Sequence, residues 1–333
     1  MRHSDRDHIQ RRDMNAAAAA AAKRRAKKKQ RVTEEMSFPD VAVALLQEQA
    51  AQMAAHKAGT ISGKDPEDLH DLRVATRRAR SALRLFMPLA AGEALKVVRK
   101  ELSWIGGILG DVRNLDVFLL NLRKQLDRAS TGPDEQRTLI TAAEQMREPC
   151  HARMVKALGS ARFERILVVL QDETTLRTPL LAQAEMTARE VGWEIIHAAL
   201  EEVMSKSKGD VARYPYDKLH RIRIALKRLR YACEFFTNVF ADGLRKQIKR
   251  VVRYQDCLGE MQDALVARRI MQYLVDRLVA DGHGTPTVLI AAGAMMQLQL
   301  ETAEARREKF CATWDKFPKV TNRIEKALTE RDG

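Results

Sequence analysis

The chain has 333 residues, enough for one large domain or two moderate ones. Apolar residues make up 45% of it, and with only 16 Gly and 9 Pro the composition favours helices over strands and can fill a core. The net charge of +14 indicates an anionic partner, namely a nucleic acid, an anionic membrane surface or another polyanion. No apolar run approaches the roughly 18 residues that a membrane span needs, so we expect no membrane span.

The four cysteines, Cys150, Cys233, Cys257 and Cys311, are scattered along the chain. None forms a Cys-x-x-Cys pair or lies near a His at metal-ligand spacing, which predicts small core residues and no metal site. No signal peptide is recognisable either, so the sequence predicts a protein of the reducing cytoplasm.

Residues 1–36 are rich in Ala, Lys and Arg. Ala16–Ala22 leads into the basic run Lys23–Lys29, and residues 1–35 carry eleven Lys and Arg against five Asp and Glu, a local charge of +6. No apolar face accompanies this run, which predicts a disordered tail. An auxiliary clamp on a polyanion, such as a nucleic acid, is a compatible role. The rest of the chain keeps +8, so the tail alone does not explain the basic character.

A helical period runs from about Pro39 to Leu328 and predicts eight to ten helices of 15–30 residues. Turn signals separate these helices, and no alternating segment of strand length occurs. The sequence therefore predicts an all-α helical bundle over residues 37–328.

An internal repeat is the main organisational feature of this bundle. The segment His70–Phe86 matches His220–Phe236 at an offset of 150 residues. The His, most of the basic positions and the closing Phe coincide in the two segments.

A second match follows the first at almost the same offset. Leu109–Asn114 corresponds to Leu258–Asp263 at an offset of 149, and we interpret both as Leu-Gly turns. Two matches at nearly one offset indicate the duplication of a helical half, with halves of about 37–205 and 206–328.

Each repeated segment has a cationic face if it forms a helix, because successive helical residues lie about 100° apart. The first cationic stripe, about 80° wide, comprises His70, Arg73, Arg77, Arg80 and Arg84. The second comprises His220, Arg223, Lys227 and Arg230. Arg78 and Arg228 lie outside the stripes, at about 80° from the His. The apolar residues, such as Leu72 and Ile222, lie opposite the cations and predict the buried faces.

Cations at this spacing repel one another by a few tenths of a kcal/mol per pair. The first stripe contains no acid and the second only Glu234, at its end. The pattern therefore predicts an external anion such as successive phosphates, which accept charge-assisted hydrogen bonds from guanidinium groups. The alternatives are a solvated basic face and ion pairs with acids of neighbouring helices.

Further cations follow each repeated segment. They are Lys96, Arg99 and Lys100 after the first, and Lys246, Lys249 and Arg253 after the second. If each half packs as an αα-hairpin, these residues extend the same patch. The alternative is an ordinary basic surface.

The motif His70-x-x-Arg73-x-x-x-Arg77-Arg78-x-Arg80 and its echo from His220 to Tyr231, with the two Leu-Gly segments, resemble the CHAD family, the conserved histidine α-helical domain. The resemblance covers roughly residues 38–326. It implies two four-helix halves related by a pseudo-twofold axis, with a central basic groove that binds inorganic polyphosphate. It also implies a possible location on polyphosphate granules.

The resemblance implies a set of polyphosphate ligands at the matching positions: His70, Arg73, Arg77, Arg78, Arg80, His220, Arg223, Lys227, Arg228 and Arg230. Lys100, Arg113 and Lys249 are weaker additions. Arg113-Asn114 departs from the usual Arg-Asp of the family, so we expect the first half to be held slightly differently.

The sequence predicts a binding protein rather than an enzyme, and no cofactor. Phosphoryl transfer needs metal-holding carboxylates or a phosphate-cradling loop, and no Walker-type Gly-x-x-x-x-Gly-Lys motif occurs. Non-sequence-specific nucleic-acid binding is the alternative, although aromatic residues make up only 5% and none interleaves with the first stripe. A scaffold role leaves the basic repeat unexplained, and the oligomeric state stays open.

Overall fold

The computed structural model describes residues 32–127, 131–240 and 243–330. Within these ranges the protein is helical, and the only β contact is an isolated bridge between Ser37 and Thr187. The all-α prediction is therefore confirmed. The α-helices are α2 Phe38–Ser62, α3 Pro66–Phe86, α4 Ala94–Leu126, α5 Pro133–Leu158, α6 Ala161–Gln171, α7 Glu173–Arg177, α8 Ala188–Lys206, α9 Tyr216–Phe235, α10 Gly243–Ala280, α11 Pro286–Trp314 and α12 Phe317–Thr329.

The number and lengths of the helices differ from the predicted eight to ten of 15–30 residues. Eleven α-helices lie in the described ranges, because short capped helices follow α5. Ser160 caps α6 by accepting a hydrogen bond from the amide of Phe163, and Asp172 caps α7 by accepting one from the amide of Thr174. Most of the basic tail predicted for residues 1–36 lies outside the described residues.

The two Leu-Gly segments are not turns, so that prediction is wrong. Leu109–Asn114 lies inside α4, a helix of 33 residues, and Leu258–Asp263 lies inside α10, a helix of 38 residues. Glycine weakens a helix by only about 1 kcal/mol relative to alanine. The buried leucines beside the two glycines, Leu109 and Leu258, outweigh that cost because both are completely shielded from solvent.

The described chain divides into two compact units. Unit 1 comprises the residues up to Gly110 together with Met154–Ala188, and unit 2 comprises Asp111–Arg153 and the residues from Arg189 onward. Helices α4 and α5 each contribute residues to both units. The pseudo-twofold relation of the sequence halves and the central groove stay predictions.

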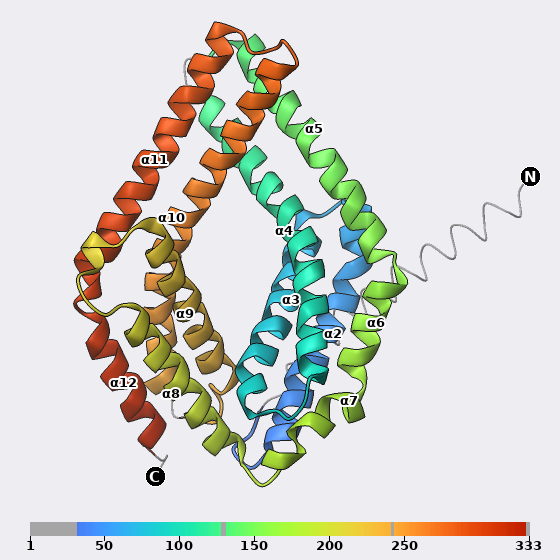
Figure 1. Cartoon of the computed structure of the whole chain (residues 1–333), viewed down its shortest axis with the longest axis vertical. Helices are drawn as coiled ribbons and strands as arrows, with labels where there is room; N and C mark the ends of the chain where they lie inside the picture. Colours follow the sequence, from blue (N-terminus) through green and yellow to red (C-terminus); the bar gives the residue numbers. More distant parts are fainter. Residues whose placement is uncertain (1–31, 128–130, 241–242, 331–333) are drawn as a thin grey trace, which may run out of the picture. The chain divides into compact units, whose positions relative to one another are not determined.

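Unit 1 is built on the antiparallel pair of α2 and α3, which pack along each other (Figure 1). Phe38 at the start of α2 meets Phe86 at the end of α3 edge to face, with ring centroids 5.4 Å apart. Both rings are fully buried. This contact ties the two ends of the hairpin together and fixes which face of α3 points inward.

Unit 2 contains α8 to α12, with α9, α11 and α12 all packed against α10. The far end of the α10–α11 hairpin joins the end of α4 and the start of α5 in a second core region. Its members include Leu122, Leu139, Leu274 and Ala292. Figure 1 shows these four helix segments converging at the end of the long hairpin.

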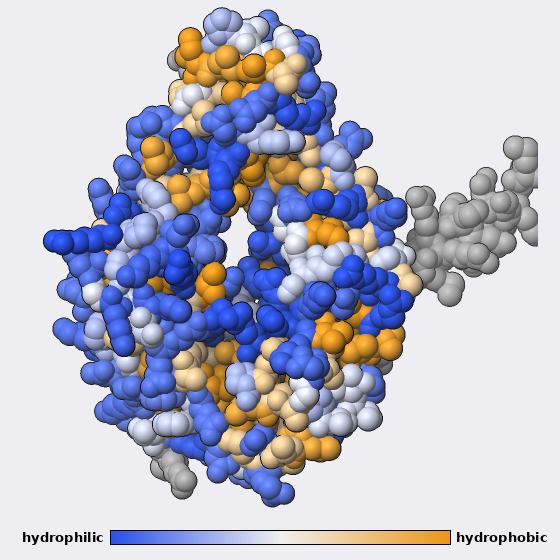
Figure 2. Space-filling model, viewed as in Figure 1, coloured by the Kyte–Doolittle hydropathy of each residue, from blue (hydrophilic) through white to orange (hydrophobic). Residues whose placement is uncertain are grey.

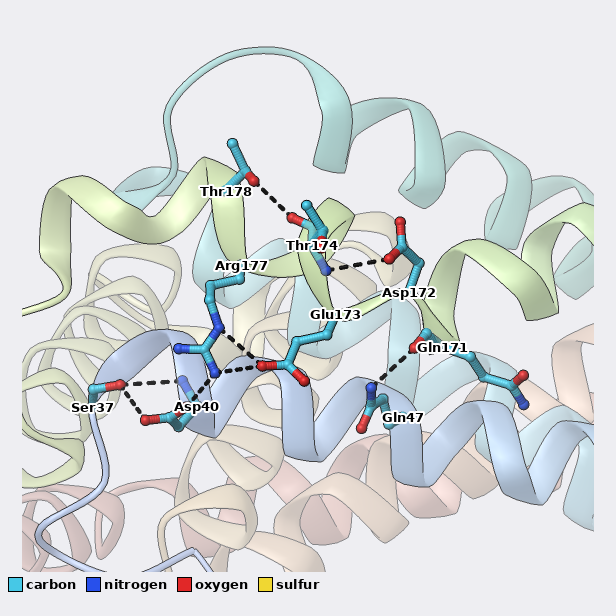
Figure 3. A network of polar contacts seen from close by, with 9 residues as sticks. All are labelled: Ser37, Asp40, Gln47, Gln171, Asp172, Glu173, Thr174, Arg177 and Thr178. Atoms are coloured by element: carbon cyan, nitrogen blue, oxygen red, sulfur yellow. Dashed lines mark hydrogen bonds and ion pairs between the residues drawn. The ribbon is translucent and has the colours of Figure 1, made fainter.

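Short helix α7 is attached to α2 by the polar network of Figure 3. Arg177 donates hydrogen bonds to Asp40 at 2.5 Å and to Glu173 at 2.8 Å. The hydroxyl of Ser37 donates to the other carboxylate oxygen of Asp40 at 2.5 Å, and Gln47 donates to the carbonyl of Gln171 at 3.0 Å. The network thus joins the N-terminal half of α2 to the segment that follows α6.

The network should make the free energy of unfolding depend on pH in the acidic range. The hydrogen bond from Ser37, followed by that from Arg177, lowers the pKa of Asp40 below its ordinary value of 3.8, against a smaller opposing effect of burial. A lowered folded-state pKa gives stability that is present above the unfolded value and is lost as pH falls through the folded value.

We therefore expect Asp40→Asn to lower the free energy of unfolding at pH 7 by about 0.5–1 kcal/mol, as for other half-exposed pairs. The difference from the wild type should shrink below about pH 4. Urea unfolding at pH 7 and near pH 3.5 measures both values, with Asp134→Asn on the exposed start of α5 as the control. A difference that stays constant across this range would contradict the assignment.

Candidate functional site

The first cationic stripe lies on α3, in unit 1. Asp65 caps this helix, Pro66 opens it, and Glu67 and Asp68 occupy its first turn, where acids favour the positive helix end. The predicted apolar face is buried to at least 96% at every position: Leu72, Ala75, Ala79, Ala82, Leu83 and Phe86. This confirms the helical register. Because the apolar face is fixed inside unit 1, the cationic face cannot turn inward.

The second stripe lies on α9, in unit 2, and its apolar face is equally well packed. Ile222, Ala225, Leu226, Leu229, Ala232 and Phe236 are all fully buried. The burial pattern of His220–Arg230 matches that of His70–Arg80 position by position, including intermediate exposure at each shared cation. The sequence repeat is therefore also a repeat of packing environment.

All cations of the two stripes except Arg84 are half-buried rather than free in solvent. His70, Arg73, Arg77 and Arg80 have intermediate exposure on α3, and Arg84, one turn further on, is exposed. Half-burial lowers the local dielectric constant, so a charge here acts more strongly on a bound anion than a fully solvated lysine does. These are the conditions in which guanidinium groups bind phosphate tightly.

The N-terminal end of the first stripe contains a buried pair that the sequence analysis missed. His56 of α2 approaches Asp68 of α3 with 2.8 Å between Nδ1 and Oδ1, and its Nε2 lies 3.6 Å from Asp71. Asp68 is only 6% exposed. The antiparallel packing of α2 and α3 brings these residues together. The only signal in the sequence is that His56 precedes the acidic first turn of α3 by about twelve residues, a spacing that allows contact across a helical hairpin. The pair positions the turn of α3 that precedes His70.

His220 at the head of the second stripe is oriented by α10. Its Nδ1 lies 2.9 Å from Oε1 of Gln262 in a hydrogen bond. Gln262 belongs to the Leu258–Asp263 segment of the second sequence match. Its counterpart in the first half by sequence is Arg113, which is half-buried in α4.

Two predicted ligands in α9 have acidic partners within the protein. Arg228 forms an ion pair with Glu202 of α8, and Arg230 donates to Glu234, four residues along α9, at 2.6 Å. Arg228 was placed outside the stripe by helical geometry, and Glu202 occupies that side. The pair of Arg228 with Glu202 corresponds to the alternative of an ion pair with an acid of a neighbouring helix, whereas the pair of Arg230 with Glu234 lies within α9. Arg78 has the position on α3 that is equivalent to Arg228 on α9.

The first half of α4 lies against the cationic face of α3. A side-chain carbon at Gly106 would lie 3.6 Å from both Nη1 of Arg80 and the methyl group of Thr76. Arg99 is two turns earlier on the same side of α4, and its Nε is buried without a hydrogen-bond partner among the described residues. Lys100 is exposed, and Lys96 pairs with Glu93 at 2.5 Å. Of Lys96, Arg99 and Lys100, Arg99 is therefore the cation closest in register to the α3 face.

The cations of α10 lie on a different side of the helix from its contact with α9. A side-chain carbon at Gly259 would lie 3.8 Å from Nε of Arg223, which marks the α9-facing side. Lys246, Lys249 and Arg253 lie about 80–140° around the helix from Gly259. Arg253 lines a pocket with α11 and α12 instead. The structure thus brings Arg253 together with residues that the sequence analysis did not consider.

Metal-binding clusters and membrane-spanning helices are both absent from the part of the chain that the structure describes. No group of three or more His, Cys, Asp or Glu residues there could hold a metal ion. Within the same ranges, none of the helices combines the length and the apolar character required to cross a bilayer.

A family model for the CHAD domain matches residues 44–272, more than half of the chain. The chain belongs to the CHAD domain family. CHAD domains are all-helical and are associated in general with polyphosphate binding. The match contains both basic helices, α3 and α9, and ends before α11 and α12 begin.

Two solved structures share the fold. A crystal structure of the CHAD domain from the plant Ricinus communis superposes with a TM-score of 0.68 at 25% identity, covering 84% of this chain and 95% of that one. PptA from Streptomyces chartreusis gives a TM-score of 0.65 at 21% identity, covering 84% of this chain and 100% of that one. The CHAD-type helical fold therefore extends well beyond the residues of the family match.

Curated relatives with the same helical region occur in Mycobacterium tuberculosis. Uncharacterized proteins of two strains are 26% identical over 264 residues, which covers 77% of this chain. The chain spans about half the length of these relatives, 49% of each.

Proposed function

We propose that this CHAD domain binds inorganic polyphosphate through the cationic faces of α3 and α9, with both faces contacting one polyphosphate chain along a shared groove. The observation that supports this most strongly is the repeated environment of the two stripes. Each presents half-buried cations at matching positions, while the opposite face of each helix is locked into a core. Binding of this kind would also allow the protein to associate with polyphosphate granules.

The spacing of the stripes supports a linear anion with charge at every repeat. Successive cations at three- and four-residue intervals rise about 4.5–6 Å along a helix. A polyphosphate chain carries a negative charge on each phosphate and can follow such a line. Several guanidinium groups then donate charge-assisted hydrogen bonds to neighbouring phosphates.

The aromatic residues of the two helices favour polyphosphate over single-stranded nucleic acid. Phe86, Tyr231, Phe235 and Phe236 are all at least 97% buried. Nucleic acids without sequence preference are bound by stacking bases on exposed aromatic rings beside a basic groove. These rings are used for the core instead, so the faces offer phosphate contacts without base contacts.

A competition experiment tests the proposal. Labelled long-chain polyphosphate is bound to the full-length protein at near-physiological salt, and unlabelled polyphosphate, single-stranded DNA, duplex DNA and RNA compete at matched phosphate concentration. Because all four competitors supply phosphate but only three carry bases, we expect polyphosphate to displace the label at the lowest concentration. If DNA or RNA displaces it at a lower concentration than polyphosphate does, the protein is a nucleic-acid binder and the proposal is wrong.

A further inference from the structure

A second basic site lies in unit 2, on the side of α10 that carries Arg253. It is a pocket of about 650 Å³ formed where α10, the end of α11 and the start of α12 meet. That volume lies in the range of pockets that hold small ligands. The α11 and α12 residues that line it, such as Lys309 and Lys319, lie outside residues 44–272 of the family match.

The lining of this pocket is strongly cationic. Seven Lys and Arg side chains line it against two acids, Asp256 and Glu260. Glu260 is already paired with Arg306, at 2.6 Å between Nε and Oε2. Figure 2 shows that the visible surface over α12 and the adjoining end of α11 is predominantly hydrophilic.

Most of the remaining cations have no acid partner inside the described part of the protein. No ion pair with a carboxylate of these residues involves Arg253, Lys309, Lys316, Lys319 or Arg323. Arg250 donates to the neutral amide of Gln247 at 2.9 Å. Cations from three helices therefore outnumber the acids in the lining, which raises the positive potential in the pocket.

An aromatic cluster holds the three helices in place at the base of the pocket. Tyr254 of α10 meets Trp314 of α11 and Phe317 at the start of α12 edge to face, with centroids 5.5 and 5.3 Å apart. Trp314 stacks on Phe317 at 4.4 Å, and the hydroxyl of Tyr254 donates to the carbonyl of Thr313 at 3.1 Å. The pocket is thus built on rigid contacts, so that binding an anion would require little rearrangement of the backbone.

We propose that this pocket binds a compact oligophosphate group of about three phosphates, supplied by inorganic tripolyphosphate or by the triphosphate of a nucleotide. The pocket carries five more cations than acids. Each phosphate brings about one to two negative charges, so about three of them balance this excess. The site does not depend on the α3 and α9 faces, because Arg253 lies on a different side of α10 from Gly259, which faces Arg223.

The test measures hydrogen exchange of the full-length protein with and without inorganic tripolyphosphate, and separately with ATP, at near-physiological salt. Peptides from residues 306–329 report on the pocket, and peptides from α9 report on the second stripe. We expect tripolyphosphate to protect the α11–α12 peptides. Lys309→Glu combined with Lys319→Glu should weaken that protection at least tenfold on the concentration scale, because both exposed side chains line the pocket.

The matched control is Arg268→Glu with Arg269→Glu, which makes the same change in net charge at positions of α10 that do not line the pocket. It should leave the protection of residues 306–329 unchanged. A second pocket variant, Lys316→Gln with Arg323→Gln, removes two charges without reversing them. It should also weaken protection, and it keeps the proposal testable if the charge-reversed variant misfolds.

The two probes separate the sources of the oligophosphate. Equal protection by tripolyphosphate and ATP would support a site for the phosphates alone, and stronger protection by ATP would support a nucleotide. Absence of protection by both probes in the wild type, or equal weakening in the pocket and control variants, would overturn the proposal. Since the α9 peptides are measured in the same experiment, failure of the pocket is distinguishable from failure of the proposed polyphosphate faces.

Discussion

Reversing four stripe charges, with Arg73→Glu, Arg77→Glu, Arg223→Glu and Lys227→Glu in one protein, is expected to abolish binding of long-chain polyphosphate. Each charge-assisted hydrogen bond to phosphate contributes about 1.5–3 kcal/mol, so the loss of four should weaken binding at least about a thousandfold. Filter binding or calorimetry at near-physiological salt measures the affinity, and circular dichroism checks that helix content is unchanged. The salt dependence of the remaining binding should also become shallower, because fewer counterions are released.

The control for this variant carries the same change in net charge at positions outside both faces: Lys124→Glu, Arg137→Glu, Arg268→Glu and Arg269→Glu. It should retain most of the affinity, since it changes only long-range attraction. If the control loses as much affinity as the stripe variant, binding depends on overall charge and not on α3 and α9.

The two halves of the variant test whether one polyphosphate chain contacts both faces. If it does, reversing the charges of only the α3 pair or only the α9 pair should weaken the binding of long polyphosphate chains far more than the binding of chains too short to reach both faces. Independent faces would instead leave about half of the binding capacity at unchanged affinity. Comparing long with short chains therefore tests whether the two faces share one polyphosphate chain.

Among additions of a single methyl group in unit 1, Gly59→Ala is expected to destabilise the protein most. A side-chain carbon at Gly59 would lie 1.9 Å from Oδ2 of Asp68 and 2.3 Å from its Cγ, far inside contact distance. Asp68 cannot move away without leaving His56, to which it is joined at 2.8 Å in a buried pair. Overpacking and a disrupted buried pair each cost a few kcal/mol, so we expect a loss of about 3 kcal/mol in the free energy of unfolding.

Urea unfolding measures this loss, and Gly107→Ala provides the matched control. Gly107 is also in a helix interior, but it is exposed, and no atom lies within 4 Å of the position that an added methyl group would take. That substitution should stabilise the protein by about 0.5–1 kcal/mol through helix propensity alone. A Gly59→Ala protein as stable as the wild type would show that the contact between Asp68 and His56 is not required for the hairpin of α2 and α3.

The sequence was sufficient for features that depend on local periodicity. The buried faces of α3 and α9 follow from the spacing of residues such as Leu72 and Ile222, because a helix places residues three and four apart on one side. The all-α fold follows from the same periodicity. The position of the cations opposite these faces needs no knowledge of tertiary structure either.

Features that depend on packing could not be predicted from the sequence. Gly110 and Gly259 carry the usual signal of a turn, yet burial of the neighbouring leucines keeps α4 and α10 continuous. The partner of Arg228 is Glu202, on the preceding helix α8, and no spacing rule indicates such a contact. Only the folded arrangement of α10, α11 and α12 reveals that Arg253 lines a pocket together with Lys319.

The glycine at position 259 is expected to lower the stability of α10 while leaving the guanidinium of Arg223 open to the proposed polyphosphate ligand. Glycine costs the interior of α10 up to about 1 kcal/mol relative to alanine. The methyl group of an alanine there would meet Nε and Nη2 of Arg223 at 3.8 and 3.9 Å, an ordinary contact distance, so the unliganded protein could accommodate it. That methyl group would nevertheless cover one side of the guanidinium. Engineering that replaces helix glycines with alanine to raise heat tolerance would therefore do so at the expense of the cationic face.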